Sequence, residues 1–172
     1  MVQPEIIVAI LSGYRLSVKG IHGVSHWGRV FETGLRLAAR TGADPDVVAL
    51  FSVLHDARRW NDGRDPEHGR RGAALASRLR PLMQVTDEQF AHLLHACMYH
   101  SDGATKGDVT VQACWDADRL DLWRVGISPR DSWLCTHAAR DAELQAWTRL
   151  RSVEDHLPDC AVEWLRTAKR SQ

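Results

Sequence analysis

The sequence contains few cysteines, and none of them are spaced as a metal-binding pair. The 172-residue chain has four, and no Cys-x-x-Cys pair occurs among them. They are Cys97, Cys114, Cys135 and Cys160. A thiolate zinc site usually contains such close pairs, and small secreted domains carry cysteines at a higher density. We therefore expect reduced, buried thiols and a cytoplasmic protein.

A long apolar run and an excess of one charge are also missing. The apolar residues 6–11 follow Pro4 and Glu5 rather than a cationic stretch, and they fall far short of the roughly 20 residues that a membrane span needs. We expect a soluble chain without a secretion signal or a membrane partner. Lys plus Arg and Asp plus Glu each number 22, so no overall field attracts nucleic-acid polymers or anionic membranes. Any basic binding surface must be local.

Internal repeats, low-complexity tracts and long Gly/Ser linkers are absent, and strand signals are weak throughout. The length suits one domain, because a single core is usual at this size. The turn and cap residues recur at intervals suited to helices of three to five turns. We therefore predict an all-α fold over residues 1–172, a single compact bundle of six or more helices with negligible strand.

Three segments carry signals for helix starts. Asp44-Pro45 combines an N-cap residue with proline at the first helical position, and Asp65-Pro66 repeats this pair just before His68. Thr86 is followed three residues later by Gln89, which is capping-box spacing, and should open a helix that runs towards Tyr99.

Polar residues interrupt the apolar faces of the predicted helices. Residues at i, i+3 or i+4, and i+7 share a helix face, and by this spacing four histidines or aspartates lie among apolar neighbours. They are His26, His55, His68 and Asp118. Asp118 lies on one stripe with Cys114, Leu122 and other apolar residues from Val111 to Val125.

The same geometry selects among neighbouring candidates. Asp116 projects roughly opposite to Asp118, and Asp121 lies on the flank, so Asp118 is the inward carboxylate. Substitution of Asp116 by alanine should then leave metal and turnover nearly intact. Of the three histidines in residues 92–100, His92 points away and His95 lies to the side, which leaves His100 at the helix end.

A single inward histidine is more often a hydrogen-bonded core residue than a metal ligand. Several of them beside buried aspartates need another explanation, because an ionised carboxylate in a core is costly unless it is paired or bound to a metal. Imidazole and carboxylate donors without thiolate suit manganese, iron, cobalt, nickel or zinc. The pattern therefore predicts a divalent transition-metal site.

The order of these residues resembles the HD superfamily, whose pattern is a histidine, a His-Asp doublet and a distal aspartate. Here they are His26, the doublet His55-Asp56, and Asp118 within Ala-Asp-Arg-Leu. His68 in His-Gly-Arg-Arg-Gly-Ala is similar to a segment of HD-GYP phosphodiesterases. Tyr-His100-Ser-Asp-Gly is similar to a segment of the symmetrical dinucleoside tetraphosphatases. The resemblance covers roughly residues 20–126, with further helices expected to pack on this core.

The resemblance implies two metals per chain. Asp56 would bridge them, His26, His55 and Asp118 would complete one coordination sphere, and His68 and His100 would belong to the other. It implies an HD-domain bundle and hydrolysis of a nucleotide or another small phosphorylated molecule by a metal-activated water. The Gly-Tyr-Pro element of cyclic-di-GMP phosphodiesterases is missing after Gly103, which argues against that substrate.

A similar ligand set holds two irons in proteins that resemble myo-inositol oxygenase, so oxygenation is the main alternative. A non-catalytic binding module is a third.

Cations near the motifs are candidates for phosphate recognition. Arg59 takes the place of the family lysine after the doublet and is, with Asp56, a predicted catalytic residue. Arg29, Lys106 and Arg119 are candidates for substrate binding. The sequence leaves three roles open for His22, one turn before His26: an added metal ligand, a donor that supports a ligand, or a hydrogen bond within the loop. Core packing explains most of the seven tryptophans, but Trp60 follows the doublet and is a candidate for stacking on a nucleobase. The oligomeric state is not indicated.

Overall fold

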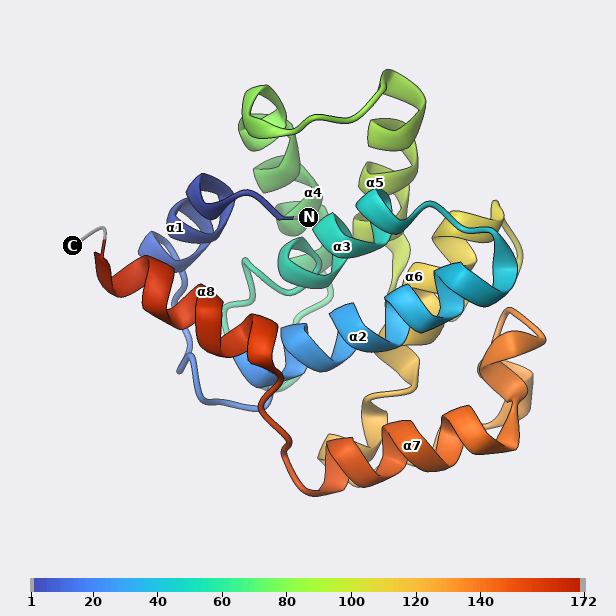
Figure 1. Cartoon of the computed structure of the whole chain (residues 1–172). Helices are drawn as coiled ribbons and strands as arrows, with labels where there is room; N and C mark the ends of the chain where they lie inside the picture. Colours follow the sequence, from blue (N-terminus) through green and yellow to red (C-terminus); the bar gives the residue numbers. More distant parts are fainter. Residues whose placement is uncertain (1, 171–172) are drawn as a thin grey trace.

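The structure, a computed structural model that describes residues 2–170, contains eight α-helices, four short 3-10 turns and no strand within these residues (Figure 1). The helices are α1 (Pro4–Ser12), α2 (Val24–Thr41), α3 (Pro45–Leu54), α4 (His68–Leu79), α5 (Asp87–Tyr99), α6 (Val109–Arg119), α7 (Ala142–Val153) and α8 (Asp159–Arg170). The predicted all-α fold with six or more helices is confirmed. No helix of the described residues combines the length and the apolar character that crossing a membrane requires.

Helix α2 runs through the middle of the molecule, with α3 and α6 packed on it (Figure 1). Its residues Val30 and Leu37 are fully buried, and α3 is buried along its whole length from Val47 to Leu54. Helices α1 and α8 pack on each other, while α7 packs against α2 and the turn Leu122–Val125. One continuous hydrophobic core connects the helices, so the site described below lies inside a well-packed frame.

Helices α4 and α5 form an antiparallel pair (Figure 1). Two glycines of α4 permit its close approach to neighbouring backbone. A Cβ at Gly69 would lie 2.6 Å from the carbonyl oxygen of Cys97 in α5, and one at Gly72 would lie 2.7 Å from that of Leu54 in α3. The absence of these two side chains therefore lets the start of α4 lie directly on the ends of α3 and α5.

Two of the three predicted helix starts are confirmed. The Asp44 carboxylate accepts from the backbone N–H groups of Asp46 and Val47, and Thr86 and Gln89 form a complete capping box. The prediction for Asp65 is wrong, because α4 begins at His68 and Glu67 precedes it as the flanking residue. The Asp65 carboxylate instead accepts from the Trp60 backbone N–H and from Arg71, and so closes the loop after the doublet.

The apolar stripe predicted to run from Val111 to Val125 is interrupted. Helix α6 ends at Arg119, and the chain then tightens into the 3-10 turn Leu122–Val125, which stops at Gly126 in the left-handed region with φ of 76°. The 3-10 turn no longer follows the α-helical period, so the helical spacing does not predict the direction of the side chains after Arg119.

The four cysteines are free thiols. Cys97 and Cys114 are buried, and Cys135 and Cys160 are half-buried. Burial raises the pKa of all four, to about 12 for Cys135 and Cys160. This agrees with a packing role and leaves little reactive thiolate at neutral pH.

Candidate metal centre

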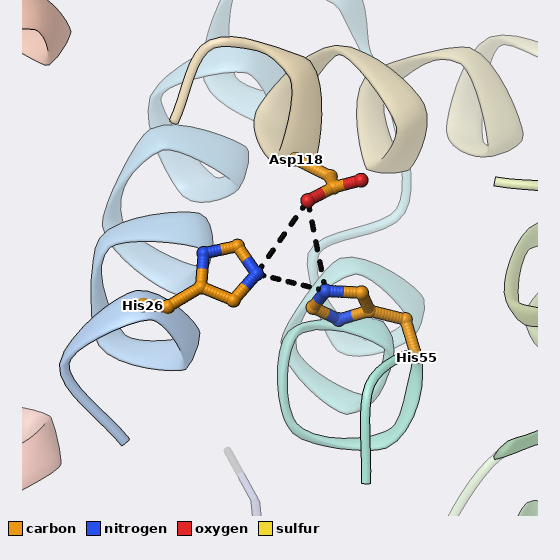
Figure 2. A group of neighbouring side chains, drawn as sticks. All are labelled: His26, His55 and Asp118. Atoms are coloured by element: carbon orange, nitrogen blue, oxygen red, sulfur yellow. Dashed lines mark hydrogen bonds and ion pairs between the residues drawn. The ribbon is translucent and has the colours of Figure 1, made fainter. Parts of the chain in front are cut away.

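Three of the predicted ligands meet at the ends of three helices (Figure 2). His26 lies in the first turn of α2, His55 directly follows α3, and Asp118 lies in the last turn of α6. The Nε2 atoms of the two histidines are 3.1 Å apart, and they lie 3.5 and 3.7 Å from Asp118 Oδ1. These three side chains form the first group of a candidate metal centre.

The other three predicted ligands form a second group. His68 is the first residue of α4, His100 directly follows α5, and Asp56 follows His55. The Nε2 atoms of His68 and His100 are 2.7 Å apart, and they lie 3.3 and 3.7 Å from Asp56 Oδ1. The structure thus brings all six predicted residues together, in the two sets that the resemblance implied.

Asp56 lies between the two groups. Its Oδ1 faces the second group, while its Oδ2 lies 3.7 Å from the Nε2 atoms of both His26 and His55. His22 Nδ1 lies 2.8 Å from the same Oδ2. Burial opposes ionisation of Asp56, but the surrounding histidines, His55 first, hold its pKa well below the usual range. The carboxylate is therefore an anion placed to serve both groups.

The outer nitrogen of each ligand histidine has an acceptor. Nδ1 contacts a backbone carbonyl in three cases, Phe51 for His55, Asp65 for His68 and Cys97 for His100. A carbonyl can only accept, so these Nδ1 atoms carry the hydrogen. The Nδ1 of His26 lies 2.7 Å from the Asp121 carboxylate. This arrangement is the usual support of metal-binding histidines, since it fixes the ring and the tautomer.

The inner nitrogens consequently direct their lone pairs at one another. Burial lowers the pKa of His26 and of His68 to about 4, with Arg124 adding to the effect at His26 and His100 at His68. Burial also lowers the pKa of His55, whereas Asp56 and Asp118 raise that of His100 against the effect of burial. The lowered pKa values favour neutral rings at His26, His55 and His68, and neutral rings whose Nε2 lone pairs converge repel one another unless a cation lies between them.

Donor chemistry and spacing both fit divalent metals. Two donors each about 2.1 Å from one cation lie roughly 3.0 to 3.4 Å apart in octahedral or tetrahedral geometry. The inter-donor distances of 2.7 to 3.7 Å bracket this range. The two groups, each with two imidazoles and one carboxylate, could therefore hold one metal ion each.

A buried ion-pair network supports the first group from behind. Asp121, with a 3% exposed side chain, accepts from Arg29 Nε at 2.7 Å as well as contacting His26, and the Ser152 hydroxyl donates to it. Arg29 also donates to Asp155 at 2.8 Å. Burial alone would raise the pKa of Asp121, but His26 and Arg29 lower it far below its usual range. Asp121 therefore stays ionised and orients His26.

A cavity of about 380 Å³ opens onto the centre. Its walls include ligands of both groups together with cationic and apolar side chains. The lining residues that bear on the argument are His22, Arg59, Arg119, Leu122, Arg124 and Trp133. A cavity lined by the ligand side chains together with arginines suits a small anionic molecule.

The predicted phosphate-binding residues have different positions. Arg59 lines the cavity, with Nη1 3.4 Å from Asp56 Oδ1, and donates to the carbonyl of Gly63. Arg119 also lines the cavity, but its guanidinium donates to the carbonyls of Trp133 and Ala104. Arg29 is buried in its ion pairs, and Lys106 lies exposed outside the cavity lining. Arg59 and Arg119 therefore line the cavity, whereas Arg29 and Lys106 lie outside its lining, and the substrate-binding role of these two residues stays a prediction.

Asp116 points away from the centre, as helical geometry predicted, but it is not dispensable. It is fully buried, and its carboxylate accepts from the backbone N–H groups of Cys135 and Thr136 at 2.6 and 2.8 Å. That alanine here leaves metal and turnover nearly intact stays a prediction, but the substitution should lower stability because it removes the anchor of the 135–136 loop. Helical periodicity predicted the direction of the Asp116 side chain, but it could not predict that the 135–136 loop packs against that carboxylate.

Trp60 lies outside the cavity that opens onto the metal centre. It is 59% exposed and borders a separate pocket, with the Arg71 guanidinium 3.9 Å from its ring centre. The structure therefore removes Trp60 from the candidate active site. His92 and His95, the two histidines that the sequence argument rejected, also lie outside the two ligand groups.

Sequence reasoning missed three supporting residues. Asp121 and Arg124 were given no role, and His22 was left open. Arg124 lines the cavity, and its Nε donates to the carbonyl of Ile21 at 2.8 Å. Their proximity to the centre depends on the turn after α6 and on the loop before α2, which no helical period describes. The only available signal was their closeness in sequence to Asp118 and His26.

The glycine contact between α4 and the doublet gives a test of how the second group is assembled. A Cβ at position 72 would lie 2.7 and 2.9 Å from the carbonyl oxygens of Leu54 and His55. We expect Gly72→Ala to push α4 outwards, to destabilise the protein by about 1 to 3 kcal/mol, and to weaken metal binding at His68 more than at His26. Urea unfolding and metal titration measure the two effects. Ala74→Gly, at an exposed position of the same helix, is the control, and equal metal affinities in both variants would contradict the prediction.

Comparison with protein-family models, with curated proteins and with solved structures found no match.

Proposed function

We propose that this chain is a two-metal phosphohydrolase of the HD superfamily that acts on a nucleotide or another small phosphorylated molecule. The observation that carries the proposal is the pair of His/Asp groups with Asp56 between them, next to a cavity that is lined by ligands of both groups and by arginines. The HD motif order in the sequence supports the same assignment. Each group offers only nitrogen and oxygen donors, as catalytic sites for hydrolysis commonly do.

His26, His55 and Asp118 would hold one metal, His68 and His100 the other, and Asp56 would contact both. Metals bound there would supply a nucleophilic water at neutral pH and stabilise negative charge on a phosphoryl oxygen. His22 is a positioning residue in this scheme, because its ring nitrogen lies 2.8 Å from Asp56 Oδ2 and can hold the carboxylate in its bridging orientation.

Arg59 and Arg124 are the cations best placed to receive a phosphate. Both line the cavity, and Arg59 lies beside the second ligand group, 3.2 Å from His68 Nε2. A planar guanidinium matches two phosphate oxygens, which favours substrates with a terminal or bridging phosphate. The cavity volume of about 380 Å³ lies within the range of small-molecule sites and suits a mononucleotide better than a polymer.

The test is a metal and substrate screen under two atmospheres. Protein purified without chelator should contain up to two divalent metals per chain by mass spectrometry. Anaerobic protein loaded with manganese should hydrolyse at least one member of a panel of nucleotides and generic phosphodiesters. Arg59→Gln should raise KM for that substrate by roughly 10-fold, as expected for loss of a charge-assisted contact, while Lys106→Gln should leave KM unchanged.

The outcomes separate the proposal from the oxygenase alternative. Turnover that requires iron and consumes oxygen, with no anaerobic hydrolysis, would replace it by di-iron oxygenation. Metal-free protein that remains unable to bind added manganese, zinc or iron would refute a metal enzyme of either kind.

A further inference from the structure

A second cavity lies on the other side of the loop after the doublet. It has a volume of about 340 Å³ and shares no lining residue with the cavity at the metal centre. We call it the basic pocket, and its lining residues are Gly13, Arg15, Arg58, Trp60, Arg71, Ala74 and Arg78. The adjacent residues Arg58 and Arg59 thus line different cavities.

The basic pocket carries an excess of positive charge. Among its four arginines, Arg71 is paired with Asp65. Arg58 donates to the backbone carbonyls of Ala9, Ile10 and Ala57, and no carboxylate lies within ion-pair distance of it among residues 2–170. Burial, and then the charges of Arg78 and Arg15, lower the pKa of Arg58. The cations therefore repel one another, and an anion between them would relieve the repulsion.

Neighbouring backbone closely surrounds the Arg58 guanidinium. A Cβ at Gly13 would lie 2.8 Å from its guanidinium, so the glycine after α1 leaves space for the arginine. The carbonyls of Ala9 and Ile10 at the end of α1 fix one edge of that guanidinium. Arg58 is therefore held in place in the pocket, while Arg15 and Arg78 reach it from exposed positions.

An aromatic ring borders the same pocket. Trp60 is 59% exposed, more than any of the other six tryptophans. The Arg71 and Arg15 guanidinium carbons lie 3.9 and 5.9 Å from its ring centre. Large exposed aromatic surface is a common mark of a binding site, and an indole face can stack on a flat ring. Arginines and an exposed indole together suit a ligand that joins an aromatic base to phosphate.

We propose that the basic pocket binds a nucleotide, with its phosphates on Arg15, Arg58 and Arg78 and its base on Trp60. The pocket is a binding site and not a second reaction centre, because its lining contains only arginine, tryptophan, glycine and alanine. A nucleic-acid polymer would need an extended basic surface, whereas here the arginines surround one pocket of a chain with equal numbers of basic and acidic residues. The pocket therefore favours a small ligand.

The variants that test this proposal avoid the supports of the metal centre. Arg71 is unsuitable, because it holds Asp65, whose backbone carbonyl anchors His68. Arg15 and Arg78 are exposed, so the double variant Arg15→Gln/Arg78→Gln should fold normally by circular dichroism. The control with the same change in charge is Arg64→Gln/Arg70→Gln, at two exposed arginines outside the pocket lining.

Binding is measured by isothermal titration calorimetry with ADP, inorganic pyrophosphate and a single-stranded oligonucleotide as probes. The pocket variant should bind ADP at least about 10-fold more weakly than the wild type, the effect of losing charge-assisted contacts, and the control within about 2-fold. Trp60→Leu should weaken ADP binding and leave pyrophosphate binding unchanged, because only the base loses its partner.

Equal ADP affinity in the pocket variant and the wild type would overturn the proposal. Oligonucleotide binding that is tighter than ADP binding and is lost in the pocket variant would also overturn it, in favour of a polymer. The metal centre can also bind ADP under the proposed function, so the result that counts is the loss of ADP affinity in the pocket variant relative to the Arg64→Gln/Arg70→Gln control. Turnover by the metal centre is measured separately, so failure here and failure of the phosphohydrolase assignment are distinct results.

Discussion

Asp56→Ala should lose both metals and turnover together. The substitution removes the one carboxylate whose two oxygens face the two ligand groups. The converging imidazoles would then have to hold the cations with only Asp118 as an anionic partner. Loss of supporting residues outside the ligand set already costs 10- to 100-fold in metal affinity or activity in typical sites. We therefore expect a loss of at least about 100-fold in turnover, with metal content near zero.

Two aspartates provide comparisons for this experiment. Asp62 lies at an exposed position of the neighbouring loop, and the Asp62→Ala variant should retain metal, turnover and stability. Asp116→Ala should retain the ligand groups but unfold more easily, because three hydrogen bonds to the 135–136 loop are lost. A folded Asp56→Ala protein with full metal content would contradict the bridging assignment. Loss of metal in Asp116→Ala alone would show that the wrong carboxylate had been selected.

Asp121→Ala should be among the most destabilising single substitutions in the chain. The Arg29 side chain is 3% exposed, and the substitution removes the closest anionic partner of its guanidinium. It also removes the acceptor of His26 Nδ1. Removing one partner of a buried ion pair typically costs about 3 to 5 kcal/mol, because the remaining charge is buried without compensation. Urea unfolding measures this loss. Metal binding by the first group should weaken as well, because His26 is no longer oriented.

The matched control is an ion pair on the surface. Glu163→Ala breaks the exposed pair with Arg166 in α8 and should change the free energy of unfolding by less than about 1 kcal/mol. The double variant Arg29→Met/Asp121→Leu should recover part of the stability lost in Asp121→Ala, since apolar side chains can replace a buried ion pair, yet it should not recover the metal affinity of His26. A stability loss in Asp121→Ala no greater than that in Glu163→Ala would contradict the supporting role of Asp121.

Helical periodicity and cap residues were sufficient to predict the all-α fold and two of the three helix starts. They failed at Asp65, where an Asp-Pro pair of the cap type instead closes a loop through Arg71. The signal is local, whereas the competing partner lies six residues away and becomes available only when the loop folds back. The interruption of the stripe after Arg119 has the same cause, a tight turn that the average period cannot describe.

The sequence by itself determined the helical class and four of the six ligand candidates, because an inward polar residue is visible as a break in a local apolar pattern. Asp56 and His100 were added from the His-Asp doublet and from the end of the helix. Tertiary structure alone decided that Asp121 supports His26 and that Arg29 is paired with Asp121 and so is not free to bind substrate. It also separated Arg58 and Trp60 from Arg59 and placed them in another pocket. The reason is physical: periodicity reports which face of one helix is buried, but contacts between helices depend on where chains end, turn and cross.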